Sequence, residues 1–163
     1  MKTLYFIRHG KAAITSTSGN DADRMLTDVG VERTKRVADY IADTDPEIDL
    51  IISSPAERAY ATALIISDRL GISGNKMQAR EHLFLGDADV MIEMIQNLDE
   101  TVNKVMIVGH NPVISKVARR FEKRLNDLLP TTGVVSVHVN TDTWANLEQA
   151  EVIHNFTVWP GML

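Results

Sequence analysis

The sequence predicts a three-layer α/β sandwich, in which helices cover both faces of a parallel sheet. Apolar runs without alternation, typical of strands buried on both faces, lie at residues 4–7, 48–52 and 102–108. Stretches with a helical spacing of apolar residues separate these runs, so strands and helices alternate along the chain. The chain has no internal repeat or linker, and its length suits a single domain over residues 1–163.

The first strand delivers two functional side chains to its C-terminal end. Arg8 and His9 follow the apolar run directly and precede Gly10. Residues 11–24 are rich in small and polar residues without a periodic pattern, which predicts a loop longer than the usual connection. Thr27 is then expected to cap a helix. Its buried face is expected to carry Val29, Val37 and Ile41.

The second predicted helix begins with a strong local signal. Ser54 is expected as N-cap and Pro55 as the first helical residue, with Glu57 completing a capping box. Gly71 is expected just past the end of this helix. Arg58 lies in the first turn, where side chains lean toward the helix N-terminus. Its guanidinium is therefore expected to face the C-terminal edge of the sheet.

The second half of the chain continues the alternation. Residues 76–83 form a weaker candidate strand, and Asp87 is expected to cap the next helix. The third apolar run stops at His110, after which Asn111 is expected as N-cap and Pro112 as the first helical residue. The remaining expected elements are the rest of that helix through Leu125, a strand over 134–139, and one or two strands within 144–159.

Composition and missing motifs exclude several kinds of chemistry. The chain has no cysteine, which excludes disulfides, a thiolate nucleophile and a cysteine-based zinc site. The net charge of −5 opposes non-specific nucleic-acid binding. No stretch approaches the ~20 apolar residues of a membrane helix, and no leader precedes the first strand, so the cytoplasm is the expected compartment. Nucleotide loops and paired Asp residues at metal spacing are also missing.

Three strand ends carry the residues capable of chemistry. Arg8 and His9 follow the first strand, Arg58 follows the second, and His110 and Asn111 follow a later one. The carboxyl ends of parallel strands meet at one edge of a sheet. Two guanidiniums, two imidazoles and helix N-termini together suit a tetrahedral phosphoryl group. With no thiol or metal motif, nucleophilic catalysis by histidine is the favoured interpretation.

These motifs together resemble the histidine phosphatase superfamily, also called phosphoglycerate mutase-like. The resemblance spans nearly the whole chain and implies a mostly parallel central sheet with an antiparallel edge. Segments 24–27, 86–87 and 130–132 also look like the SixA branch of phosphohistidine phosphatases. The motifs that carry the wider resemblance are Arg8-His9-Gly10, Ser53-Ser54-Pro55 with Arg58, and Val108-Gly109-His110-Asn111-Pro112.

The resemblance implies a role for each matching residue. His9 is expected to be the nucleophile that forms a phosphohistidine intermediate. Arg8 and Arg58 are expected to clamp the phosphate, and His110 to donate a hydrogen bond to it. No cofactor or metal is implied. The two arginines are also expected to lower the pKa of His9, which keeps the nucleophile neutral.

The general acid and the further phosphate contacts stay open. Glu81 lies near the position where many family members place an acid, and it is favoured over Asp87 and Asp89. If no acid is well placed, labile phosphoramidates should be preferred over alkyl phosphates. Asn111 and Thr15 are candidate phosphate ligands. Two further residues, Ser16 and Thr132, are open as contacts, and the three other histidines, His82, His138 and His154, are interpreted as surface or structural.

The leading hypothesis is a metal-independent phosphatase that acts on a phosphohistidine-bearing protein in cytoplasmic signal transduction. Only residues 84–86 are expected between the third strand and the next helix, which leaves little chain to cover the site and favours a protein substrate. One alternative is a small-molecule phosphomonoesterase or, less favoured, a mutase. A second alternative is a non-catalytic phosphate-binding module. Neither a nucleic-acid nor a membrane partner is expected.

Overall fold

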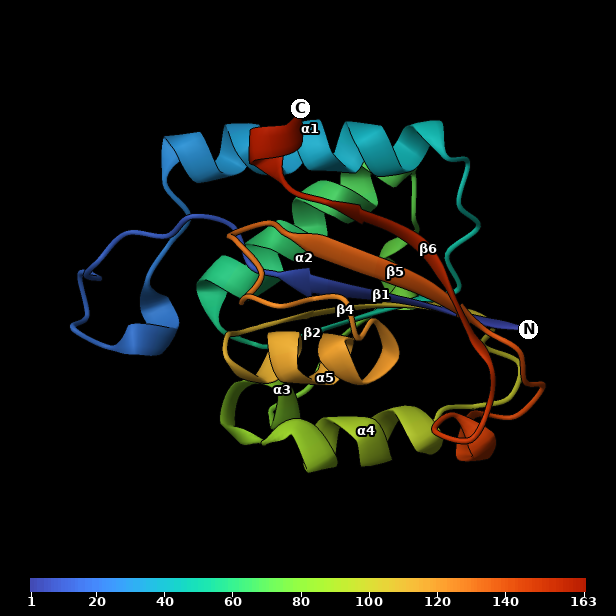
Figure 1. The fold of residues 1–163 in the computed structure, drawn as a ribbon. Coiled ribbons are helices and arrows are strands. Elements are labelled where there is room, and N and C mark those ends of the chain that lie inside the picture. The colour runs from blue at the N-terminus through green and yellow to red at the C-terminus, as the bar shows by residue number, and fades with distance from the viewer.

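The chain forms one six-stranded sheet with helices on both faces, as the computed structural model of residues 1–163 shows (Figure 1). Along the sheet the strand order is β3-β2-β4-β1-β5-β6. The strands are β1 (Lys2–Arg8), β2 (Leu50–Ser53), β3 (Met77–Ala79), β4 (Lys104–Gly109), β5 (Val134–Val139) and β6 (Val152–Val158). The helices are α1 (Asp28–Asp43), α2 (Glu57–Leu70), α3 (His82–Leu85), α4 (Ala88–Gln96) and α5 (Val113–Phe121).

The pairing confirms the three-layer sandwich with a mostly parallel sheet. The pairs β1–β4, β4–β2 and β2–β3 are parallel, whereas β1–β5 and β5–β6 are antiparallel and form the expected antiparallel edge. No helix is both long enough and apolar enough to span a membrane.

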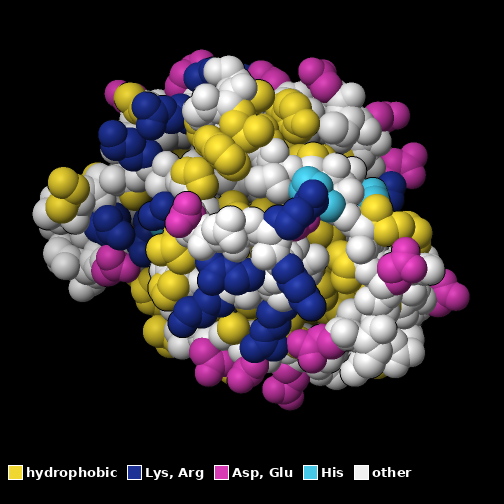
Figure 2. All heavy atoms as spheres, viewed as in Figure 1, with side chains coloured by type: hydrophobic (Ala, Val, Ile, Leu, Met, Phe, Trp, Pro, Cys, Tyr) yellow, Lys and Arg dark blue, Asp and Glu magenta, His cyan; other side chains and the backbone are white.

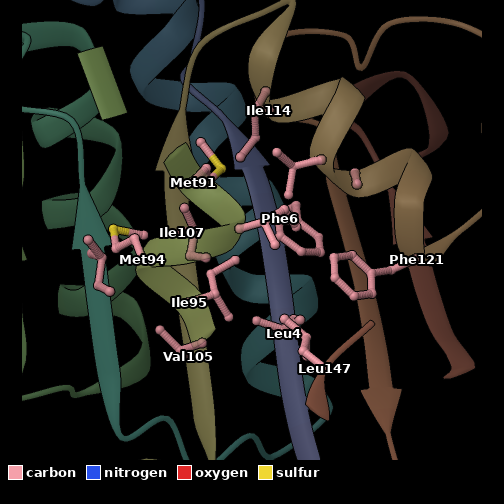
Figure 3. Packing of buried hydrophobic residues seen from close by; sticks show 14 of the residues in the cluster. Leu4, Phe6, Met91, Met94, Ile95, Val105, Ile107, Ile114, Phe121 and Leu147 are labelled. Carbon is pink, nitrogen blue, oxygen red and sulfur yellow. The ribbon is translucent and has the colours of Figure 1, made fainter. Parts of the chain in front are cut away.

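Strand β1 is buried on both faces of the sheet. Leu4 and Phe6 belong to the core under α4 and α5, and Tyr5 and Ile7 to the core under α1 and α2. Phe6 stacks on Phe121 of α5 with ring centroids 5.5 Å apart, and Figure 3 shows both rings within the packed cluster. Burial on both faces explains why apolar residues do not alternate in this run.

Helix α2 begins later than the sequence pattern predicts. It starts at Glu57 with Ala56 as N-cap, and no side chain caps it, so the predicted capping box with Ser54 and Pro55 is wrong. The hydroxyl of Ser54 instead accepts a bond from the Ala56 N–H at 3.2 Å and pairs with Nε2 of His110 at 2.8 Å. The Ser54 hydroxyl, which was expected to cap the helix, is therefore bound to His110, a residue distant in the sequence.

Helix α5 shows the same shift. It begins at Val113 rather than at the preceding proline, and it ends at Phe121, a turn earlier than expected. Asn111 is not its N-cap. The Asn111 amide nitrogen donates to the carbonyl oxygen of Leu129 at 2.8 Å, and its side-chain oxygen accepts a bond from the hydroxyl of Ser115. Asn111 therefore ties the segment after α5 to the sheet edge.

Two caps are confirmed and one predicted core residue is wrong. Thr27 and Asp87 cap α1 and α4, each accepting a bond from the backbone N–H three residues further on. Val29, predicted on the buried face of α1, is 46% exposed, while Val37 and Ile41 are buried as expected. The first turn of α1 approaches its neighbours through Gly30, which packs against the backbone of Lys11.

The connection after β3 also differs from the prediction. The candidate strand over residues 76–83 is a strand only at Met77–Ala79, and its end belongs to the short helix α3. The chain between β3 and α4 is therefore longer than the expected 84–86. Strand 134–139 is confirmed, and the region 144–159 holds one strand, β6.

Candidate active site

The ends of three parallel strands form the floor of the site. Strand β4 lies between β1 and β2, with Arg8 opposite Gly109 and Ser53 opposite Val108. Residues that follow these strands therefore meet at one edge of the sheet, as the sequence predicts. A cavity of about 310 Å³ opens there. Its lining consists of Arg8, His9, Lys11, Ala12, Arg24, Arg58, His110, Asn111 and Thr131.

His9 is buried, and its orientation fixes its tautomer. Nδ1 lies 2.7 Å from the carbonyl oxygen of Gly10. Because that oxygen can only accept, Nδ1 carries the proton and Nε2 keeps its lone pair. Burial is the main cause that lowers the pKa of His9; the nearby Arg58 and Arg8 also lower it, the hydrogen bond to Gly10 acts in the opposite direction, and the resulting pKa is about 4. His9 is thus a neutral imidazole with a free nucleophilic nitrogen near pH 7.

His110 faces His9 across the site. Their ring centroids are 5.1 Å apart, and Phe84 of α3 packs edge-on against His110 with centroids 5.5 Å apart. Nε2 of His110 pairs with the hydroxyl of Ser54. Burial, followed by the proximity of His9 and Arg58, lowers the pKa of His110 to about 3. Both imidazoles of the site are therefore neutral at physiological pH.

Two guanidiniums are held at the cavity by backbone and side-chain oxygens. Arg8 donates from Nη1 to the carbonyl oxygen of Leu129 at 3.1 Å. Arg58, which is only 5% exposed, donates from Nη1 to the carbonyl oxygen of Asp21 at 2.8 Å and from Nη2 to its carboxylate at 3.0 Å. These bonds restrict the positions of both guanidiniums before any anion binds.

A third arginine, which the sequence analysis did not single out as a ligand, also lines the cavity. Arg24 donates from Nε to the Asp21 carboxylate at 2.9 Å and from Nη1 to the carbonyl oxygen of Ala13 at 3.0 Å. The signal available in the sequence is a basic residue shortly before the Thr27 cap, at the end of an unusually long loop. Lys11, at the start of the same loop, adds a further cation to the lining.

The buried side-chain polar atoms that lack a partner all belong to this site. They are Nε of Arg8, Nε of Arg58 and Nδ1 of His110. Buried polar groups in folded proteins are almost always hydrogen-bonded. Three exceptions on three residues lining one cavity indicate a polar site that the protein's own groups do not complete. An anion with several acceptor oxygens suits this surplus of positive charge and donors.

Comparison with known proteins places this site in a family. A model of the histidine phosphatase superfamily (branch 1) matches residues 4–97. The chain belongs to the histidine phosphatase superfamily. It is 26% identical to the phosphohistidine phosphatase SixA of Escherichia coli over 161 residues, covering 92% of this chain and 99% of SixA. An uncharacterised protein of Picosynechococcus is 32% identical over 71% of this chain and 70% of its own length.

Solved structures show the same fold over nearly the whole chain. The protein histidine phosphatase SixA complexed with tungstate superposes with a TM-score of 0.83 at 22% identity, covering 98% of each chain. A mycobacterial glucosyl-3-phosphoglycerate phosphatase superposes with a TM-score of 0.66 at 17% identity, over 98% of this chain and 99% of that one. This histidine phosphatase is thus closer in shape to SixA than to that enzyme, and the family membership makes it a phosphatase.

No carboxylate lines the cavity of this histidine phosphatase. Glu81, the favoured candidate acid, is exposed just before α3 and is not part of the lining. The two alternatives are engaged elsewhere, because Asp87 caps α4 and Asp89 pairs with Arg120. Asp21 lines the neighbouring hollow of the loop, and its carboxylate accepts hydrogen bonds from Arg24 and Arg58.

The structure separates the remaining candidates from the cavity, with one exception. Asn111 lines it, although both ends of its amide bond to protein groups. Thr15 and Ser16 are not part of the cavity lining but line a neighbouring hollow of the loop that shares Arg24 with it, and the buried Thr132 pairs with the hydroxyl of Thr34. The other histidines lie outside the cavity: His138 pairs with Thr3, His154 with Thr157, and His82 is exposed. No group of three or more potential ligand side chains is arranged to hold a metal ion.

Proposed function

We propose that this histidine phosphatase hydrolyses phosphohistidine on a protein, without a metal ion, through a phosphohistidine intermediate at His9. The observation that carries the proposal is the lining of the cavity: guanidiniums and two neutral imidazoles, with no carboxylate. Such a site provides charge neutralisation and a nucleophile. It provides no carboxylic acid to protonate a leaving group.

Phosphohistidine is the substrate class that this composition suits. The lone pair on Nε2 of His9 attacks phosphorus, and the phosphorus–nitrogen bond of the substrate breaks with its electron pair passing to the leaving nitrogen. The other ring nitrogen of that imidazole takes up a proton from solvent near neutral pH, and once it is protonated the leaving group departs as neutral imidazole. An alkoxide leaving group would require a proton from a general acid. The lack of a lining carboxylate therefore favours phosphoramidates over alkyl esters.

The cationic side chains stabilise the transferring group. Arg8, Arg24 and Arg58 are placed to offset charge on its equatorial oxygens, which is the main demand of phosphoryl transfer. His110 is placed beside the nucleophile to contact the same oxygens. In the second step water attacks phosphorus, the bond to Nε2 of His9 breaks and its electron pair returns to that nitrogen. The water proton leaves with phosphate or to solvent.

The test is rapid-quench labelling with a phosphohistidine-bearing protein domain that carries radioactive phosphate, in the presence of EDTA. The wild type should take up an acid-labile, alkali-stable label and release phosphate. His9→Ala should lose the label, and turnover should fall by at least about a thousandfold, because removal of a catalytic nucleophile typically costs 10³ or more. Phosphate binding should persist in this variant, since the arginines remain.

Three results would contradict the proposal. Unchanged turnover in His9→Ala would exclude His9 as the nucleophile. Loss of wild-type turnover in EDTA would exclude metal independence. Efficient cleavage of small phosphate esters, with no cleavage of any phosphohistidine protein, would instead support the small-molecule phosphomonoesterase.

A further inference from the structure

Three hollows follow one another from the active-site cavity across the protein surface. Thr131 lines both the active-site cavity and a second hollow of about 470 Å³. Pro130 and Trp159 line both that second hollow and a third one of about 670 Å³. The segment after α5 supplies most of the lining of the third hollow, from Glu122 to Pro130. The three hollows therefore adjoin one another through shared residues, and together, from the cavity at His9 to Met162, they are called the path.

The second hollow is basic. Arg33 and Arg36 of α1 line it and both are exposed; the lining includes no Asp or Glu side chain, and it also includes Leu163, the last residue of the sequence. Arg36 donates to the backbone oxygen of Leu163, whereas Arg33 takes part in none of the ion pairs of the molecule. On a chain with a net charge of −5, Arg33 therefore contributes a positive charge without an ion-pair partner beside the catalytic cavity.

The third hollow exposes apolar side chains. Leu128 is 55% exposed, Met162 54% and Trp159 36%. Figure 2 shows hydrophobic side chains gathered between groups of Lys and Arg on this face. Glu122 and Asp127 are also part of the lining, and Arg124 pairs with the Glu122 carboxylate at 2.9 Å. Contiguous exposed apolar groups rimmed by polar ones are typical of protein-binding surfaces.

The path is also tied to the catalytic residues. The carbonyl oxygen of Leu129, a residue of the third hollow, accepts bonds from Arg8 and from Asn111. A substrate polypeptide that lies along residues 128–131 would therefore be next to Arg8, one of the guanidiniums that face the phosphoryl group. This juxtaposition suits a substrate that extends beyond its phosphoryl group.

We propose that this path is a docking surface for the protein substrate. It recognises acidic side chains next to the phosphohistidine through Arg33 and Arg36, and apolar side chains further along through Leu128 and Trp159. The proposal rests on the proposed function and adds to it the chemistry of the partner: an acidic segment followed by apolar residues. Complementary charge raises association rates, and apolar burial adds affinity.

The test uses synthetic peptides with one central phosphohistidine. The first peptide carries Glu beside the phosphohistidine and Leu further along. In the second, Lys replaces Glu, and in the third, Ser replaces Leu. Phosphorylated imidazole reports the basal activity. The wild type should hydrolyse the first peptide with a kcat/KM about tenfold above the other two, a factor typical of one or two good contacts.

Matched variants separate docking from catalysis. Arg33→Glu should lower kcat/KM for the first peptide about tenfold, and Leu128→Ser about fivefold. Neither variant should change the rate at which phosphorylated imidazole is hydrolysed. Leu128→Ser should not affect the third peptide. The controls are Lys76→Glu, at the opposite edge of the sheet before β3, and Leu64→Ser, on the exposed face of α2. Neither control should change any rate.

Equal rates for the three peptides, or equal losses in the controls, would overturn the docking surface. If the wild type hydrolyses no phosphohistidine substrate, the proposed function fails, and docking is then measured by fluorescence anisotropy of the labelled, unphosphorylated first peptide. Binding that Arg33→Glu abolishes would still support the surface, and no binding would overturn it. If the surface instead binds a single-stranded RNA, and Arg33→Glu abolishes that binding, the proposed protein partner is wrong and the partner is a nucleic acid.

Discussion

At the scale of residues, Asp21 organises the positive charge of the active site. Its carboxylate accepts bonds from Arg58 and Arg24, and its backbone oxygen accepts another from Arg58. Partial desolvation acts against it, but the two guanidiniums hold the pKa of Asp21 below its usual value. The ionised carboxylate thus orients both arginines, and it also repels an incoming phosphate.

Replacement of Asp21 should reveal which of these effects is larger. In Asp21→Asn, the side chain keeps its shape and the backbone bond to Arg58 remains, while the negative charge is removed. We expect inorganic phosphate to bind about three- to tenfold more tightly, the scale of one partly exposed charge interaction. Phosphate affinity measured by competitive inhibition or calorimetry checks this.

The matched control for this change is Asp23→Asn. The Asp23 carboxylate accepts a bond from Ser18 and touches neither arginine, so phosphate affinity should not change. Weaker phosphate binding in Asp21→Asn would show that orientation of the arginines outweighs repulsion.

At the scale of elements, the start of α1 positions the loop that contributes Arg24. Gly30, in the first turn of α1, is so close to Lys11 that a Cβ on it would lie 2.2 Å from the Lys11 backbone oxygen. Thr27, the cap of α1, donates its backbone N–H to the same oxygen at 2.9 Å. The two ends of the long loop are therefore joined at α1.

Gly30→Ala should disturb this junction. The new methyl group meets a backbone oxygen rather than a flexible side chain, so the loop must shift. We expect a loss of about 2 kcal/mol in unfolding free energy, equivalent to about 4 to 8 °C in Tm, with weaker phosphate binding. Thermal unfolding measures the loss of stability, and phosphate titration measures the loss of affinity.

The matched control is Gly74→Ala, where a Cβ meets nothing within 4 Å. Its unfolding free energy should stay within about 0.5 kcal/mol of the wild type. Equal Tm values for the two variants would show that the junction relaxes without cost.

At the scale of the whole molecule, the buried His9 and the partly buried His110 link the active site to folding stability. Burial lowers the pKa of His9 to about 4 and that of His110 to about 3 in the folded protein, against about 6.5 for exposed histidine in an unfolded chain. Between pH 6.5 and 4 the unfolded chain therefore binds protons that the folded one does not. Stability must fall as the pH falls through this window.

We expect each active-site histidine to contribute a loss on the order of 1 kcal/mol per pH unit below about 6. Urea unfolding at pH 7.5, 6 and 5 should show a shallower decline for His9→Asn and His110→Asn than for the wild type. The exposed His82 serves as a control, and His82→Asn should follow the wild-type decline. If all four proteins decline in parallel, the active-site imidazoles are not buried as described.

The sequence alone determines the sheet and the principal residues of the site. The hydrophobic pattern of β1 and β4 is local and strong, because strands buried on both faces have few polar positions. Their ends carry Arg8, His9 and His110, and the parallel arrangement brings those ends together. Element types could therefore be predicted well, whereas the starts of α2 and α5 could not. Ser54 and Asn111 make long-range hydrogen bonds there that compete with capping.

Only the tertiary structure decides what surrounds those residues. Arg24 enters the cavity and Glu81 stays outside it because the loops that hold them are placed by packing against distant elements, such as Gly30 on Lys11. The tautomer of His9 depends on where one carbonyl oxygen points, and the low pKa of both imidazoles depends on burial. These properties arise from contacts between residues far apart in the chain, which local pattern and propensity do not encode.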